Sequence, residues 1–150
     1  MREILFRGKR IDNGEWVYGY VFDDGMADNK QVFVGGLTVS DAKRNTCDRY
    51  EVGLDFEEVD PTTIGQYTGL ADKNGAKIFE GDVVLVNWFG DNGKFVVGYE
   101  GGSFFPYQIG CKFNFNSLWD VWSQDYDGTI MEVIGNIHDN PDLLNCCDNG

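Results

Sequence analysis

The chain has 150 residues, of which 42% are hydrophobic and 15% aromatic; a domain of this size buries about 70% of the surface of its unfolded chain. Its formal net charge of −13 repels a nucleic-acid backbone or an anionic bilayer, so no direct nucleic-acid binding is expected. No apolar run reaches the roughly 20 residues of a membrane-spanning helix, and the first residues are too interrupted for a signal peptide. We therefore expect a protein of the cytoplasm with no membrane partner.

Turn signals dominate the chain. Pairs of residues that accept a positive φ occur at Asn13-Gly14, Asp24-Gly25, Asn74-Gly75, Asn92-Gly93, Gly101-Gly102 and Asp127-Gly128. In the first half, aromatic and β-branched residues predict strands over 4–6 and 16–22, joined as a hairpin, and a short strand over 31–34. Residues 35–47 are expected to form a polar loop and 49–54 to resume the sheet. The acidic stretch 55–61, closed by Pro61, is the expected boundary between two halves.

The second half predicts a meander of short strands. Residues 83–89 carry apolar side chains at both odd and even positions, which face opposite sides of a sheet. This pattern favours a central strand covered on two faces. Further strands are expected over 66–70, 77–79, 94–100, 103–107, 112–115 and 129–137, with short helical turns over 116–122 and 140–144. Spacings of roughly 8–12 residues are typical of a small barrel or sandwich, and closure removes exposed strand edges.

The expected fold is therefore mainly β. Short antiparallel strands would form a small SH3-like barrel in the C-terminal half, packed with an N-terminal β-hairpin subdomain. The domain hypothesis is a single domain over 1–150, with subdomains 1–61 and 62–150.

Three blocks of the sequence are similar to a known family. They run over residues 1–9 with 14–19, over 64–75 continuing into 78–84, and over 133–144. In this order they resemble the YopX family, which is carried by phages and prophages. The resemblance implies a phage- or prophage-encoded intracellular protein with a mainly β structure that self-associates. It implies no catalytic residues, because the family has no established activity.

Catalytic and metal-binding patterns are weak in this chain. His138, the single histidine, has Asp139 beside it as an orienting partner, but no nucleophile elbow, zinc-protease motif or phosphate-binding loop accompanies it. The four cysteines form no C-x-x-C pair and no Cys/His cluster for zinc. Two acidic groups lack EF-hand spacing and indicate at most a weak divalent site: Asp23, Asp24 and Asp28, and Asp120, Asp125 and Asp127. We expect no enzyme activity, no cofactor and no metal.

The first candidate interface is basic. Four basic residues and one acidic residue give the first ten positions a net charge of +3. Arg7, Lys9 and Arg10 would either bind an anion or an acidic face of a neighbouring copy, or protect an edge strand from aggregation by their charge. Both interpretations stay open at the level of sequence.

The second candidate interface is aromatic. Trp119, Trp122 and Tyr126 lie in one aromatic-rich stretch. Large rings in a small domain belong first to the core, but tryptophan and tyrosine left outside are enriched at interfaces. We therefore expect partner contacts here.

The functional hypothesis is a non-catalytic, homo-oligomeric binding module with a host protein as a further partner. The alternative is an acidic decoy that binds a host nucleic-acid-binding protein through the charge of −13. A third hypothesis, an enzyme that uses His138 or a divalent ion, ranks last.

Overall fold

The computed structural model describes residues 2–26, 28, 30–42, 49–88, 90–110, 117–123 and 130–145; among these, side chains are described except at 38–42, 49–52, 88 and 91. The chain divides into two compact units, Ile4–Ile64 and Met1–Glu3 with Gly65–Gly150, called here the N-terminal and C-terminal units. Strands make up most of the described residues, which confirms the predicted mainly β class. The domain hypothesis itself stays a prediction.

The N-terminal unit is an antiparallel arrangement in the order β4-β3-β2-β1. Its elements are β1 (Phe6–Lys9), β2 (Trp16–Asp23), β3 (Val32–Ala42), β4 (Arg49–Val59) and the 3-10 turn η1 (Pro61–Thr63). The predicted first hairpin is confirmed by the register of β1 on β2. Beyond β1 the chain returns to β4, where Arg10 forms a β-bridge with Val59 and the Ile11 N–H donates to the Glu58 carbonyl at 3.1 Å.

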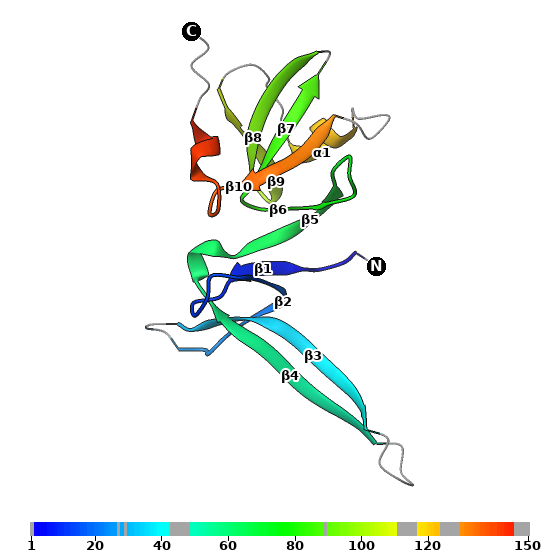
Figure 1. Cartoon of the computed structure of the whole chain (residues 1–150), viewed down its shortest axis with the longest axis vertical. Helices are drawn as coiled ribbons and strands as arrows, with labels where there is room; N and C mark the ends of the chain where they lie inside the picture. Colours follow the sequence, from blue (N-terminus) through cyan, green and yellow to red (C-terminus); the bar gives the residue numbers. More distant parts are fainter. Residues whose placement is uncertain are drawn as a thin grey trace. The chain divides into compact units, whose positions relative to one another are not determined.

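The β3–β4 hairpin is the longest feature of this unit. Its strands pair without a break from Val32 opposite Val59 to Ala42 opposite Arg49, whereas β2 pairs only with Val32–Gly35 of β3. Residues 36–42 and 49–55 therefore continue as a two-stranded ribbon (Figure 1).

Two predicted element bounds are wrong at this hairpin. Residues 35–42 of the expected polar loop belong to β3, and β4 continues past Leu54 through the acidic residues to Val59. Cross-strand pairing outweighs the lost periodicity, because a ribbon with solvated faces tolerates acidic and small polar residues.

The C-terminal unit contains a four-stranded antiparallel sheet in the order β10-β7-β8-β9 and the β5–β6 hairpin. The elements are β5 (Gly65–Ala71), β6 (Lys77–Phe79), β7 (Asp82–Trp88), β8 (Asp91–Glu100), β9 (Ser103–Ile109), α1 (Leu118–Ser123), β10 (Met131–Asn136) and the 3-10 turn η2 (Pro141–Leu144). As predicted, β7 is an interior strand. Its Val84 and Val86 pack with Phe95 of β8 and Leu118 of α1 in the core.

The turn between β7 and β8 differs from the prediction. Asn92 and Gly93 lie within β8, opposite Asn87 and Val86, and the positive φ of 89° belongs to Gly90. The observed register sets Val84 opposite Phe95, so core packing selects the turn. The predicted strand 112–115 and the Asp127-Gly128 turn lie outside the described residues.

The predicted closure into an SH3-like barrel is not confirmed. Within the described part of the C-terminal unit, the sheet is open, with β10 and β9 at its two edges. None of the helices in the described ranges is both long enough and apolar enough to cross a membrane.

Candidate functional site

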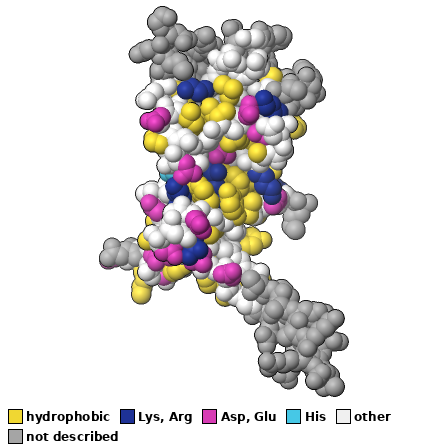
Figure 2. Space-filling view, viewed as in Figure 1, with side chains coloured by type: hydrophobic (Ala, Val, Ile, Leu, Met, Phe, Trp, Pro, Cys, Tyr) yellow, Lys and Arg dark blue, Asp and Glu magenta, His cyan; other side chains and the backbone are white. Residues whose placement is uncertain are grey.

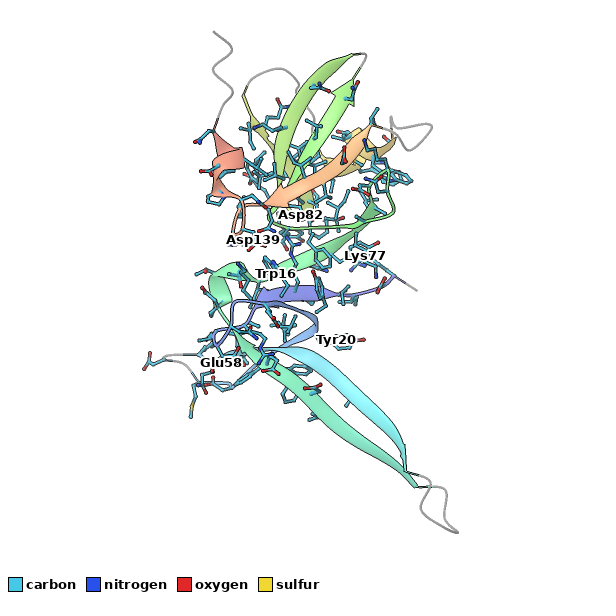
Figure 3. All side chains as sticks on the ribbon, viewed as in Figure 1. Trp16, Tyr20, Glu58, Lys77, Asp82 and Asp139 are labelled. Carbon is cyan, nitrogen blue, oxygen red and sulfur yellow. The ribbon has the colours of Figure 1, made fainter. Side chains whose placement is uncertain are left out.

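The basic residues of β1 are engaged inside the N-terminal unit. Arg7 is 6% exposed, and its guanidinium carbon lies 4.5 Å from the ring centroid of Trp16 on β2. The Lys9 ammonium lies 5.6 Å from the same ring; Figure 3 labels Trp16. A cation over an indole face is stabilised by the ring's negative electrostatic potential. Trp16 therefore serves as a common platform for Arg7 and Lys9.

Arg10 is paired with acidic side chains. Its guanidinium donates two hydrogen bonds to Asp12, at 2.9 and 2.6 Å, and lies 3.2 Å from the Glu57 carboxylate. The hydrogen bond with Asp12 raises the pKa of Arg10, and the same contact lowers the pKa of Asp12. The structure thus places Arg7 and Lys9 on the Trp16 ring and pairs Arg10 with carboxylates, and it does not gather the three into one exposed basic edge.

Trp119 and Trp122 of α1 form an exposed aromatic pair. Their rings stack with centroids 4.9 Å apart and planes at 28°, while the side chains are 58% and 39% exposed. Leu118 and Val121 of the same helix are buried in the core. Because residues three apart share a helix face, the apolar residues anchor α1 and leave the indoles outside. Tyr126, the third aromatic candidate, lies outside the described residues.

A cleft of about 360 Å³ lies beside Trp119 in the C-terminal unit. Side chains from β5, the β8–β9 hairpin, the start of α1 and the residues before β1 line it, among them Arg2, Gln66, Tyr99, Ser103, Phe104 and Trp119. Tyr99 packs edge-on against Phe104 at 5.3 Å between ring centroids. Sequence reasoning missed this cleft because its walls come from segments far apart along the chain. The interface candidate Trp119 and the Gly101-Gly102 turn were the parts of it that the sequence signalled.

The N-terminal unit exposes apolar side chains on β2, β3 and β4. The exposed side chains are Tyr18, Tyr20, Phe22, Leu37, Leu54 and Phe56. Figure 2 shows hydrophobic side chains at the molecular surface, interspersed with charged ones. Phe56 lies 5.3 Å from Phe22 and 6.4 Å from Phe33, and Leu37 pairs directly with Leu54.

Gly35 permits the close approach of β4 to β3 next to these rings. A Cβ at this position would lie 2.0 Å from the Asp55 carbonyl oxygen, so a larger residue would push the two strands apart. The glycine is therefore a structural requirement of the aromatic surface.

His138 and Asp139, the residues considered for the last-ranked enzyme hypothesis, lie in a hydrogen-bonded loop. Asn136 donates from Nδ2 to Asp139 at 3.0 Å and accepts from the backbone N–H groups of His138 and Asp139 at 3.0 and 2.9 Å. Asp139 thereby helps to close the loop after β10 (Figure 3). This arrangement gives Asp139 a structural role.

The first acidic group forms turns. The carboxylate of Asp23 accepts from the Gly25 N–H, and that of Asp24 accepts from the Met26 and Gln31 N–H groups. These backbone donors lower the pKa of Asp24. Within the described ranges no three His, Cys, Asp or Glu side chains are grouped so as to hold a metal ion; Asp125 and Asp127 lie outside them.

Comparison with known proteins identifies the family. The sequence profile described as "YopX protein" matches residues 5–145. The chain belongs to the YopX family. Comparison with curated proteins gives no significant match. The crystal structure of protein EF1440 from Enterococcus faecalis is similar at 24% identity and a TM-score of 0.61, covering 96% of this chain and 99% of that chain. That similarity shows a shared fold across nearly the whole YopX chain.

Proposed function

We propose that this YopX-family chain is a phage- or prophage-encoded, non-catalytic binding module that acts as a homo-oligomer in the host cytoplasm. The observation that carries self-association is the β3–β4 ribbon with its exposed Leu37–Leu54 pair. These two leucines are 67% and 63% exposed and lie directly opposite each other. A large apolar pair on a projecting element indicates a binding surface.

The ribbon lacks support from the rest of its unit. An isolated two-stranded hairpin is at best marginally stable in water, and a third strand or a packing partner stabilises it. Within the described residues, β2 pairs with β3 only as far as Gly35 and provides no third strand beyond that residue. A second copy of the chain supplies an identical ribbon, and two identical apolar faces are self-complementary about a two-fold axis.

Charge sets the expected salt response of this assembly. Two chains of net charge −13 repel each other, whereas ionic screening does not weaken contacts between leucine and aromatic side chains. Added salt screens the repulsion, so association should hold or strengthen as salt rises. An oligomer held by contacts between basic residues and an acidic face would instead weaken as salt rises.

The test is the native mass of the full chain by multi-angle light scattering, with reductant, over a salt series. The Leu37→Ser/Leu54→Ser double variant should shift the mass toward the monomer. The matched control is Leu144→Ser, which changes an exposed leucine of the C-terminal unit (43% exposed) and should leave the mass unchanged. A monomeric wild-type chain, or an oligomer that the double variant leaves intact, would contradict the proposal.

The acidic decoy is the alternative function. Its support is the net charge of −13, and its partner would be a basic host protein. Binding to such a partner should weaken steeply with added salt, opposite to the response expected for self-association.

A further inference from the structure

The cleft beside Trp119 has the features of a peptide-binding site. We propose that this cleft binds a proline-rich segment of another protein in the polyproline II conformation. This proposal builds on the binding role above by naming the chemistry of a partner. It concerns a surface of the C-terminal unit and does not depend on self-association through the ribbon.

The size and walls of the cleft fit such a segment. Its volume of about 360 Å³ is at the lower end of the range of ligand pockets. Tyr99 and Trp119 line it with side chains that are 55% and 58% exposed, and Phe104 packs against Tyr99 at 5.3 Å. Proline-rich segments dock into aromatic-lined grooves, because pyrrolidine rings pack flat on aromatic faces and the extended helix is already formed before binding.

Three polar side chains of the cleft are free to donate hydrogen bonds. Within the described part of the chain, the Tyr99 hydroxyl, the Trp119 indole N–H and the Arg2 guanidinium have no hydrogen-bond partner. Three other hydroxyls of the cleft already make hydrogen bonds. Thr68 Oγ1 donates to the Ile78 carbonyl at 2.8 Å, Ser103 Oγ donates to the Glu100 carbonyl at 3.4 Å, and Ser117 Oγ accepts from the Asp120 N–H.

The free donors of Arg2, Tyr99 and Trp119 match the backbone of a proline-rich segment. Proline has no N–H, and polyproline II makes no internal hydrogen bonds, so its carbonyl groups remain available as acceptors.

Charge argues against a nucleotide ligand, and the sequence argues against a second copy of this chain as the source of the peptide. Arg2 is the single cationic side chain that lines the cleft, and the chain carries −13, so a nucleotide or a nucleic acid is disfavoured. A second copy of the chain cannot supply the segment either. Its three prolines, Pro61, Pro106 and Pro141, are isolated in the sequence. The occupant is therefore a segment of a different protein.

The test is titration of the full chain with acetylated, amidated octaproline by calorimetry, with a glycine–serine octapeptide of the same length as the control peptide. We expect octaproline to bind and the control peptide not to. Trp119→Ala should weaken binding at least tenfold, because it removes an aromatic wall. Tyr99→Phe, which removes only a hydroxyl donor, should weaken binding about three- to tenfold.

The matched control variant is Tyr107→Phe. Tyr107 lies on the same β8–β9 hairpin, but its hydroxyl donates to Glu100 at 2.6 Å and it does not line the cleft. This variant should bind octaproline as the wild type does.

Unchanged melting temperatures confirm that each variant is folded. Tyr99→Phe keeps the test valid if Trp119→Ala unfolds.

Three results would overturn the inference: no binding of octaproline at millimolar concentration, binding that neither variant weakens, or binding of adenosine monophosphate with the dependence on Trp119 expected for octaproline. The Leu37→Ser/Leu54→Ser variant separates the two proposals, because it should bind octaproline normally. An oligomeric wild-type chain that does not bind octaproline would reject only the proposal about the cleft. Peptide binding by a wild-type monomer would reject only self-association through the ribbon.

Discussion

Asp72 joins the β5–β6 turn to β10, 61 residues away in the chain. Its Oδ1 atom accepts from the backbone N–H groups of Asn74 and Ala76 at 2.8 and 2.9 Å. Its Oδ2 atom accepts from the N–H of Val133 at 2.9 Å. The side chain is nearly buried, with 9% exposure, so one carboxylate shapes a turn and positions a strand of the sheet.

Asp72→Ala should destabilise the C-terminal unit by about 3 kcal/mol, because it leaves three backbone donors without their charged acceptor. Asp72→Asn is the matched control. It keeps Oδ1 for the turn but replaces the acceptor of the Val133 N–H with an amide, so its loss should be smaller. Chemical denaturation measures both variants, and equal losses would contradict separate roles for the two oxygens.

Adjacent glycines of β3 should respond differently to alanine. Gly35→Ala should destabilise the N-terminal unit by about 1–3 kcal/mol, because its Cβ would lie 2.0 Å from the Asp55 carbonyl oxygen. At Gly36 the nearest atom to an added Cβ is Tyr20 Cδ2, 3.9 Å away. Gly36→Ala should therefore be neutral or slightly stabilising. Thermal unfolding of the two variants tests this contrast, which equal melting temperatures would refute.

The Tyr107 hydroxyl should titrate above its ordinary pKa of 10.0, because its hydrogen bond to Glu100 favours the protonated phenol. The folded-state pKa is raised, so the stability from this contact is present below the unfolded-state pKa. It is lost as the pH rises through the folded-state value. Glu100→Gln should return the pKa of Tyr107 toward 10.0. Titration of the Tyr107 ring by NMR measures the shift, and an unaltered pKa in the variant would disprove the cause.

Ser117 should stabilise α1 as its N-cap, since its Oγ accepts from the Asp120 N–H at 3.2 Å. Ser117→Ala should cost about 1 kcal/mol, whereas Ser117→Asp should retain the cap. Hydrogen exchange at the α1 amides reports the local effect. Faster exchange in Ser117→Ala alone is the expected result, and equal exchange in both variants would argue against the capping role.

Local signals in the sequence predicted much of the fold. Gly14 and Gly75 have positive φ values of 70° and 80°, as their turn pairs require, and Val84 lies on an interior strand as its apolar surroundings indicate. The Asn92-Gly93 pair shows the limit of this reasoning. The turn lies at a neighbouring glycine, Gly90. The pairing of β7 with β8 in the core decides between this turn and the one predicted at Asn92-Gly93.

The surfaces were less predictable than the strands. Trp119 and Trp122 were identified as interface candidates from aromatic enrichment, and the structure leaves both exposed; their role in binding stays a prediction. The burial of Arg7 could not be foreseen, because it depends on the β1–β2 register that brings Trp16 beneath it. The cleft depends on tertiary structure in the same way.

The β3–β4 ribbon also constrains how the family can change over evolution. Beyond Gly35, β2 no longer pairs with the hairpin, so residues can be gained or lost there without disturbing that strand pairing. Successive side chains of a strand point to opposite faces, and a one-residue shift moves every later side chain to the other face. Relatives should therefore lengthen or shorten this hairpin mainly in two-residue steps on each strand, which would preserve the face that carries Leu37 and Leu54.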